Sequence, residues 1–257
     1  MNPGALKLFL LILNSYPHKN KIMRNYFKFF MAALCLLASG CRVFCTEGEG
    51  TVRTETREPG GFQKVALNIS ANIKVVKAEK SSVEISAQEN LLEKIRTRVS
   101  GTELIVSSEG CISSDEKILV TVYLAELEGL EINGSGNISV PDTFLVDKIK
   151  LDINGSGDIS GKFIAAKIAA EINGSGNITL AGSADKQNIE IHGSGNINSQ
   201  SLICNEATID VAGSGDVRVY AIKNLDVDVA GSGSVYYKGK PTINSHIAGS
   251  GKVVDEN

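Results

Sequence analysis

Seven copies of Gly-Ser-Gly recur along the second half of the chain, with starts separated by 18 to 21 residues. A repeated motif at a near-constant period is the signature of a stacked repeat architecture. The residues two before and two after each copy are Ile or Val in every repeat, and such β-branched residues favour strands. Each repeat therefore predicts a strand, a glycine turn and a second strand. The glycines predicted at these turns are Gly134, Gly136, Gly155, Gly157, Gly174, Gly176, Gly193, Gly195, Gly213, Gly215, Gly231, Gly233, Gly249 and Gly251.

Two all-β folds fit a repeat of strand, turn and strand. Hairpins would pair within each repeat and form a meander or sandwich, whereas a solenoid pairs each repeat with the next. Like residues recur at equivalent positions of successive repeats, which favours pairing between repeats. A coil of roughly 19 residues at about 3.3 Å per residue is long enough to enclose a thin core. We therefore predict a single-stranded, right-handed parallel β-helix, with regular coils over residues 131–254.

Residues 61–130 lack the Gly-Ser-Gly motif but remain rich in predicted strands. Within them, the sequence from Ile69 to Ile73 is a shortened echo of the later Ile-Asn-Gly-Ser-Gly-Asn-Ile, which predicts irregular first coils of the same solenoid. Leu91–Ile95 is predicted as one helical turn with Asn90 as its cap. Because no Pro- or Gly-rich linker interrupts the segment, residues 61–257 are predicted to form one domain.

One outward-facing position is acidic in six successive repeats. In register these carboxylates would stand about 4.8 Å apart, and like charges directly opposed in a sheet are destabilising. Three arrangements would relieve the repulsion: a solvated face with neighbouring lysines, bound divalent cations such as Ca²⁺, or a cationic partner. The acidic residues are Glu131, Asp152, Glu171, Glu190, Asp210 and Asp228.

The residue after each Gly-Ser-Gly is a weaker candidate for a metal site. It is a carboxylate in only two of the seven repeats, whereas calcium-binding β-rolls repeat an Asp after glycine. Asn, Asp and Ser at a turn satisfy local backbone groups, and stacked amides can form a ladder between coils. These residues are therefore predicted to support the turns, and no cofactor is predicted besides the open question of Ca²⁺.

The first 40 residues have the pattern of a secretory signal. They contain five Lys or Arg and no Asp or Glu, and a short apolar run over residues 31–38 follows a basic start at Met23. The Ala-Ser-Gly that precedes Cys41 resembles the lipobox of bacterial lipoproteins, which implies cleavage before Cys41 and acylation of its thiol. We predict a signal peptide over residues 1–40, with Met23 as an alternative start, and a polar lipidated tether over residues 41–60. The protein is expected to be exported and lipid-anchored in the bacterial cell envelope, at the outer membrane.

Removal of residues 1–40 leaves 21 basic against 29 acidic residues, a formal charge of −8. This charge argues against binding to nucleic acid and against electrostatic docking to anionic lipid, so membrane contact is expected through the lipid anchor only. Of the remaining cysteines, Cys111 and Cys204 are compatible with a disulfide in an oxidising envelope, although spacing alone leaves the pairing open.

The repeated Ile-Asn-Gly-Ser-Gly-Asn-Ile follows a strand-rich segment that starts near Gly61 and ends in Ile118–Leu124. This combination resembles the autotransporter adhesin head GIN domain family, over roughly residues 61–252. The resemblance implies a single-stranded right-handed β-helix shaped like the pectin lyases but without their catalytic residues, and a role in adhesion. Likeness of fold does not by itself establish a function.

The expected function is a non-enzymatic adhesion or ligand-binding module whose surface ligand is a glycan or a protein. Two alternatives stay open: a polysaccharide lyase or hydrolase on the same scaffold, and a structural envelope protein without an external ligand. Hydrolysis requires two carboxylates at a defined separation, one of them with a raised pKa, whereas the acidic residues here repeat along a surface. His192 and His246 depart singly from the repeat pattern and are interpreted as polar substitutions. No catalytic residue is therefore predicted.

Overall fold

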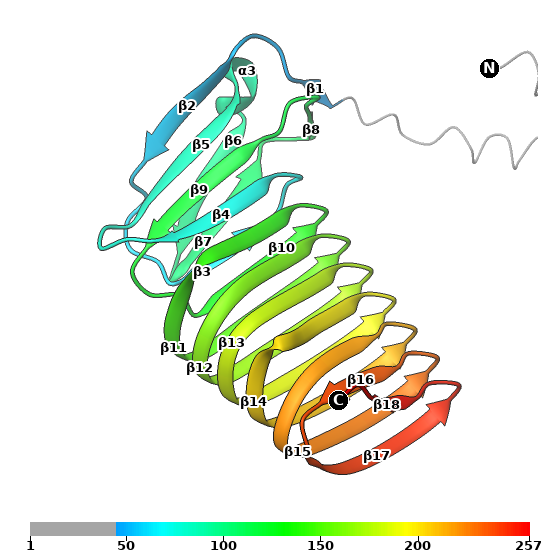
Figure 1. The fold of residues 1–257 in the computed structure, drawn as a ribbon. Helices are drawn as coiled ribbons and strands as arrows, with labels where there is room; N and C mark the ends of the chain where they lie inside the picture. The colour runs from blue at the N-terminus through cyan, green and yellow to red at the C-terminus, as the bar shows by residue number, and fades with distance from the viewer. Residues whose placement is uncertain (1–44) are drawn as a thin grey trace, which may run out of the picture. The chain divides into compact units, whose positions relative to one another are not determined.

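The computed structural model describes residues 45–257, which form a stack of parallel β-coils (Figure 1). Each long strand runs from one Gly-Ser-Gly turn to the next and pairs in parallel with the strand that follows it. Equivalent residues lie opposite each other, as Gly155 and Gly174 do. The predicted β-solenoid, with about 19 residues per coil and about seven turns, is confirmed, and hairpin pairing within repeats is excluded. The long strands are β11 (Asn137–Gly155), β12 (Asp158–Gly174), β13 (Asn177–Gly193), β14 (Asn196–Gly213) and β15 (Val217–Gly231).

The C-terminal end of the stack consists of three shorter strands. β16 (Val235–Lys238) pairs with the start of β15 on one side and with β18 (Val253–Asp255) on the other. β17 (Thr242–Gly249) pairs with the second half of β15. All residues of β17 are exposed except Ile247, which is partly buried, because no described strand pairs with its outer edge.

The coil before the first Gly-Ser-Gly turn is formed by β3 (Lys64–Leu67) and β4 (Asn72–Lys77). β3 pairs with β10 (Gly129–Gly134), and β4 pairs with the start of β11. Leu67 lies opposite Ile132 and Asn72 lies opposite Asn137. The predicted echo is therefore in the right place, but it begins at Leu67 and has the full length of the later motif.

The chain then turns back to build the N-terminal end of the solenoid. β7 (Glu103–Ser108) and β9 (Leu119–Leu124) pair in parallel with β3 and β4, which adds one coil. β6 (Ile95–Ser100) is antiparallel to β7, and β5 (Ser82–Gln88) is antiparallel to β9 (Figure 1). The spatial order β7, β3, β10 consequently differs from the order along the chain.

The segment predicted as a polar tether instead contributes two strands to this end, so the prediction is wrong for residues 46–57. β2 (Val52–Arg57) is antiparallel to β5, and β1 (Thr46–Glu47) pairs with β8 (Ile112–Ser113). Five of the six side chains of β2 are exposed. The strand is paired through its backbone, so its sequence does not show the apolar alternation by which strands are recognised. Arg57 fastens the strand, because its guanidinium donates to the carbonyl oxygens of Leu92 and Ile95 at 3.0 and 2.8 Å.

The helical turn is α3 (Glu89–Leu92), which begins two residues before the predicted start. Its N-cap is Gln88, without a side-chain capping hydrogen bond, so the predicted role of Asn90 is wrong. The Asn90 amide donates to the carbonyl oxygen of Glu47 at 2.7 Å and accepts from the backbone N–H of Glu49 at 2.8 Å. Asn90 therefore holds the segment around β1 against the helix.

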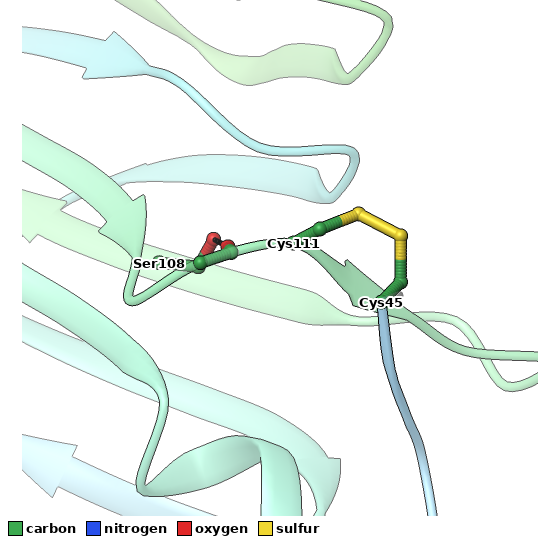
Figure 2. Close-up of a disulfide and its surroundings, with 4 residues drawn as sticks. Cys45, Ser108 and Cys111 are labelled. Carbon is green, nitrogen blue, oxygen red and sulfur yellow. Dashed lines mark hydrogen bonds between the residues drawn. A yellow bond between two sulfur atoms is a disulfide. The ribbon is translucent and has the colours of Figure 1, made fainter. Parts of the chain in front are cut away.

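A disulfide between Cys45 and Cys111 joins the start of the described chain to β8 (Figure 2). The pairing of Cys111 with Cys204, which the sequence left open, does not form. Cys204 is a free, fully buried thiol on an interior column, opposite Ala184 in one neighbouring coil and Ala221 in the other. Burial raises the pKa of its thiol to about 12.

The core consists mainly of aliphatic columns, which also accommodate aromatic rings and a buried polar pair. Gly161 leaves room for the ring of Phe163, since a Cβ at Gly161 would lie 2.6 Å from that ring. Gln187 is completely buried and accepts a hydrogen bond from the Ser199 hydroxyl at 3.1 Å, across the interior of the coil.

The predicted signal peptide and the lipidation site at Cys41 lie outside the described residues, so both stay predictions. Among residues 45–257, no helix has the length and apolarity needed to cross a bilayer.

Candidate functional site

The Gly-Ser-Gly turns are corners at which successive coils come into backbone contact. The first glycine of every turn has a φ between +136° and +147°, a conformation that favours glycine. The second glycine of each turn has no positive φ. A Cβ on Gly176 would nevertheless lie 2.2 Å from the carbonyl oxygen of Gly157 in the previous coil. The second glycine is therefore required by the distance between coils.

Two ladders of polar side chains run along the turns. In the first, each Asn donates through Nδ2 to the Asn one coil earlier, at 2.9 to 3.2 Å. In the second, amides and carboxylates bond to the side chain or backbone of the neighbouring coil. The polar residues beside the turns therefore stabilise the stack. The first ladder is Asn68, Asn133, Asn154 and Asn173, and the second is Asn72, Asn137, Asp158, Asn177, Asn196, Asp216 and Ser234.

The six predicted acidic residues stack in register and form an acidic column. In the first part of this column the carboxylates contact other side chains. Lys150 Nζ lies 2.9 Å from a carboxylate oxygen of Asp152 and 3.5 Å from one of Glu171. Burial raises the pKa of Asp152 despite this lysine, while a hydrogen bond from Asn173 and the charge of Lys150 lower the pKa of Glu171. The repulsion expected from the sequence is thus relieved here by a neighbouring lysine and an amide.

The second part of the acidic column is open. Glu190, Asp210 and Asp228 are exposed, and none of them makes a hydrogen bond or ion pair with another residue in the described part of the chain. Within residues 45–257, no group of three or more His, Cys, Asp and Glu is arranged to hold a metal ion. The three carboxylates give this end of the acidic column an uncompensated negative charge.

A row of exposed aliphatic side chains lies at the bend halfway between successive turns. Leu145 is 69% exposed, Ile164 and Ile222 are each 47% exposed, and Ile203 is 45% exposed. Leu145 lies opposite Ile164, Ile164 opposite Ser183, and Ser183 opposite Ile203. In the next coil Ile203 lies opposite Tyr220, and Ile222, two residues further along that strand, lines the same groove. We call Leu145, Ile164, Ile203 and Ile222 the apolar column.

The apolar column borders a groove of about 660 Å³. Ser183 interrupts the aliphatic row at its middle, and the small side chains of Ala165 and Ala184 also line the groove. The charged residues that line it are Asp147 and Asp185. The groove is therefore lined by large aliphatic side chains, small side chains and carboxylates.

The apolar column was missed from the sequence, although a signal for it is present. Strand alternation places every second residue outside, and several bends carry three apolar residues in succession, so either the middle residue or the two outer ones must face solvent. These triplets are Phe144-Leu145-Val146, Phe163-Ile164-Ala165 and Leu202-Ile203-Cys204.

The adjacent tyrosines Tyr236 and Tyr237 offer little open ring surface. The Arg218 guanidinium carbon lies 4.5 Å from the centroid of the Tyr236 ring and covers one of its faces. Tyr237 packs against the hydrophobic core. Neither ring is therefore presented as a free platform for a sugar.

These features define a class of molecule: a parallel β-solenoid whose turns and amide ladders hold its frame together, with an open acidic stretch and an apolar column on its surface. The chain belongs to the family described as "Putative auto-transporter adhesin, head GIN domain", whose model matches residues 61–241. The resemblance found in the sequence is confirmed.

Solved structures have the same fold. A structure described as a putative adhesin from Bacteroides fragilis is 23% identical, with a TM-score of 0.78 over 81% of this chain and 99% of that one. One from Parabacteroides distasonis, described as a putative lipid binding protein, is 21% identical, with a TM-score of 0.71 over 83% of this chain and 100% of that one. An adhesin-described structure from the same organism is 23% identical, with a TM-score of 0.69 over 82% of this chain and 100% of that one. No curated protein matches the chain in sequence.

Proposed function

We propose that this protein is a non-enzymatic adhesion or ligand-binding module of the bacterial cell envelope, held there by a lipid on Cys41. The observation that carries the proposal is the apolar column, in which four aliphatic side chains are 45 to 69% exposed. A row of exposed apolar side chains bordered by polar residues is a candidate surface for interaction. The family description as an adhesin agrees with this role, as does the description of one structural neighbour as lipid binding.

The carboxylate pair with opposed pKa shifts, Asp152 and Glu171, is the feature that would favour a hydrolase, since acid–base pairs have such shifts. Lys150 contacts both carboxylates, and the side chain of Asp152 is only 17% exposed. A pair bridged in this way has no room for a glycosidic oxygen between its members. The arrangement favours a structural role for the pair.

The binding proposal is tested with the full chain against immobilised glycans and extracellular matrix proteins. The double variant Ile164→Thr/Ile203→Thr keeps β-branched side chains at both positions but makes them polar. Leu119→Thr is the matched control, because Leu119 is also 47% exposed and lies in the N-terminal strand β9. We expect at least one ligand to bind the parent and the control but not the double variant. Equal binding of all three, or cleavage of a polysaccharide by the parent, would contradict the proposal.

The anchoring proposal is tested by Cys41→Ser. Loss of the acylated thiol is expected to move the protein from the membrane fraction to the soluble envelope fraction, because a short apolar signal segment does not by itself span a bilayer. Cys204→Ala is the control, since Cys204 is buried in the core. Retention of the Cys41→Ser variant in washed membranes would refute lipid anchoring at this residue.

A further inference from the structure

The groove beside the apolar column has a chemistry that selects among partners. Its aliphatic residues come from four coils, and the charged residues that line it are Asp147 and Asp185. Asp147 approaches Lys148 only to 3.9 Å, with both side chains at least 74% exposed, so this ion pair contributes little. A partner that buries aliphatic groups here therefore meets carboxylates at the edge of the contact.

Lysines of the neighbouring column, Lys148, Lys167 and Lys186, adjoin this groove without lining it. Lys148 and Lys167 line the adjoining hollow that shares Leu145 and Asp147 with it. Lys186 is paired with Glu206 at 2.8 Å. Beyond them, the open carboxylates of the acidic column add to the negative field of a chain that already has a surplus of acidic residues. Electrostatic complementarity thus favours a cationic partner.

The dimensions of the apolar column limit the size of this partner. From Leu145 to Ile222 the column crosses four coil-to-coil steps, roughly 19 Å at about 4.8 Å per step. A strip of this length and about 10 Å wide covers roughly 200 Å², whereas a stable interface between globular proteins buries about 800 Å² on each side. The strip suits a short segment better than a folded domain.

We infer that the apolar column binds a short amphipathic peptide segment with basic residues beside its apolar stripe, which rests on the proposed binding function. A helix of about 13 residues covers roughly 19 Å, and its 5.4 Å pitch is close to the coil spacing. Apolar side chains on successive helical turns then enter the spaces between Leu145, Ile164 and Ile203, with the widest space over Ser183. Lysines or arginines flanking the stripe reach Asp147 and Asp185. This is the helix-in-groove mode of recognition.

The test uses the full chain and a labelled synthetic peptide of about 14 residues, with Leu at helical i, i+3, i+4 and i+7 spacing and Lys elsewhere. Fluorescence anisotropy is expected to show binding of this peptide. We expect at least tenfold weaker binding to Ile164→Thr/Ile203→Thr and unchanged binding to the exposure-matched control Leu119→Thr. Retained thermal unfolding behaviour shows that the double variant is folded. Equal affinity of the parent and the folded double variant would overturn the inference.

The charge requirement is tested separately. Replacing Lys by Glu in the peptide is expected to abolish binding. Asp147→Asn/Asp185→Asn should weaken binding of the Leu/Lys peptide several-fold. The affinity should also depend less on salt concentration, because fewer ionic contacts are then screened. Glu93→Gln is the control, since Glu93 is exposed next to α3 at the N-terminal end. Equal binding of the Leu/Glu peptide, or full affinity in the double Asn variant, would overturn the inference.

Two further outcomes separate this inference from the proposed function. If neither peptide binds while the double variant loses a glycan or matrix ligand, the inference is wrong and the binding function stands. If neither peptide binds and the double variant loses binding to phosphatidylcholine–phosphatidylglycerol vesicles, the apolar column is a lipid-binding surface and the peptide inference is overturned.

Discussion

At the scale of single residues, the two glycines of each turn are required for different reasons. The first adopts a positive φ, as Gly174 does at +145°. The second lies so close to the preceding coil that a methyl group would contact a backbone carbonyl oxygen. A backbone carbonyl in a stacked frame cannot move aside as the end of a flexible side chain can.

Gly176→Ala is therefore expected to lower the free energy of unfolding by about 1–3 kcal/mol, the usual cost of overpacking, although its backbone conformation suits alanine. Urea unfolding followed by circular dichroism measures the loss. Ser175→Ala in the same turn is the control and should change stability by less than about 0.5 kcal/mol, because Ser175 is exposed. Similar losses in the two variants would show that spacing between coils does not require the second glycine.

The two carboxylates around Lys150 should have opposite effects on the pH dependence of stability. The folded pKa of Asp152 is raised above its ordinary value of 3.8, so the folded state holds this proton more tightly and stability falls as pH rises through that window. The folded pKa of Glu171 is lowered below its ordinary value of 4.5, so its contribution is lost as pH falls.

Relative to the parent, Asp152→Asn should consequently become more stable as pH rises above about 3.8, and Glu171→Gln should become less stable over the corresponding range. Urea midpoints measured from about pH 3 to about pH 7 check both signs. The two variants act as controls for each other, because their positions are one coil apart in the same column. Differences of the same sign would contradict the assigned pKa shifts.

At the scale of elements, the N-terminal end differs from the rest of the solenoid in how it is held together. The regular coils are stabilised by like-to-like pairing and amide ladders, whereas the end relies on antiparallel strands and individual fastenings. These include the contacts of Arg57 and Asn90 and the disulfide between Cys45 and Cys111. Antiparallel strands at this end pair with edges that would otherwise be left open.

Removal of the disulfide by Cys45→Ser/Cys111→Ser is expected to cost about 2–4 kcal/mol, because the bridge closes a long loop and restricts the unfolded chain. Denaturant unfolding with and without a reductant measures the effect, and the reductant should destabilise the parent but not the double variant. Cys204→Ala is the control and should keep the full response to the reductant. A parent protein insensitive to the reductant under unfolding conditions would count against the bridge.

At the scale of the whole molecule, the fold is a one-dimensional stack in which each coil contacts its neighbours. The central coils have partners on both sides, whereas β17 has a described partner on one side only. The last coil also carries Ser245 where the two preceding coils carry Val227 and Ile209. Its contribution to the core is correspondingly weaker.

Amide hydrogen exchange should therefore be slowest in β12 and β13 and clearly faster in β17 and β18. Mass spectrometry of peptides after timed exchange measures the gradient. The central strands serve as the internal control, since they share the period of the last coil. Uniform protection from β12 to β18 would show that the stack unfolds only as a whole.

The part of the fold that the sequence predicted is the part in which neighbouring repeats interact in the same way each time. The alternation around Ile153 and Ile172, together with the spacing of the glycines, indicated strands, turns and register. The acidic column was also located correctly, because register follows from the repeat. Neighbouring lysines were one of the arrangements that the sequence left open, but the contacts of Lys150 with Asp152 and Glu171 were not predicted, since they depend on the position of one side chain between two coils.

The sequence by itself determined the solenoid, its period and the family, because each coil repeats a local pattern that can be satisfied only by an identical neighbour. Only the tertiary structure decided the order of the first coils, the bond between Cys45 and Cys111, and the exposure of the apolar column. The first two depend on contacts between segments far apart in the chain. The third depends on the direction in which a bend turns the middle residue of an apolar triplet, a choice made by the packing of Phe144 and Phe163 inside the coil.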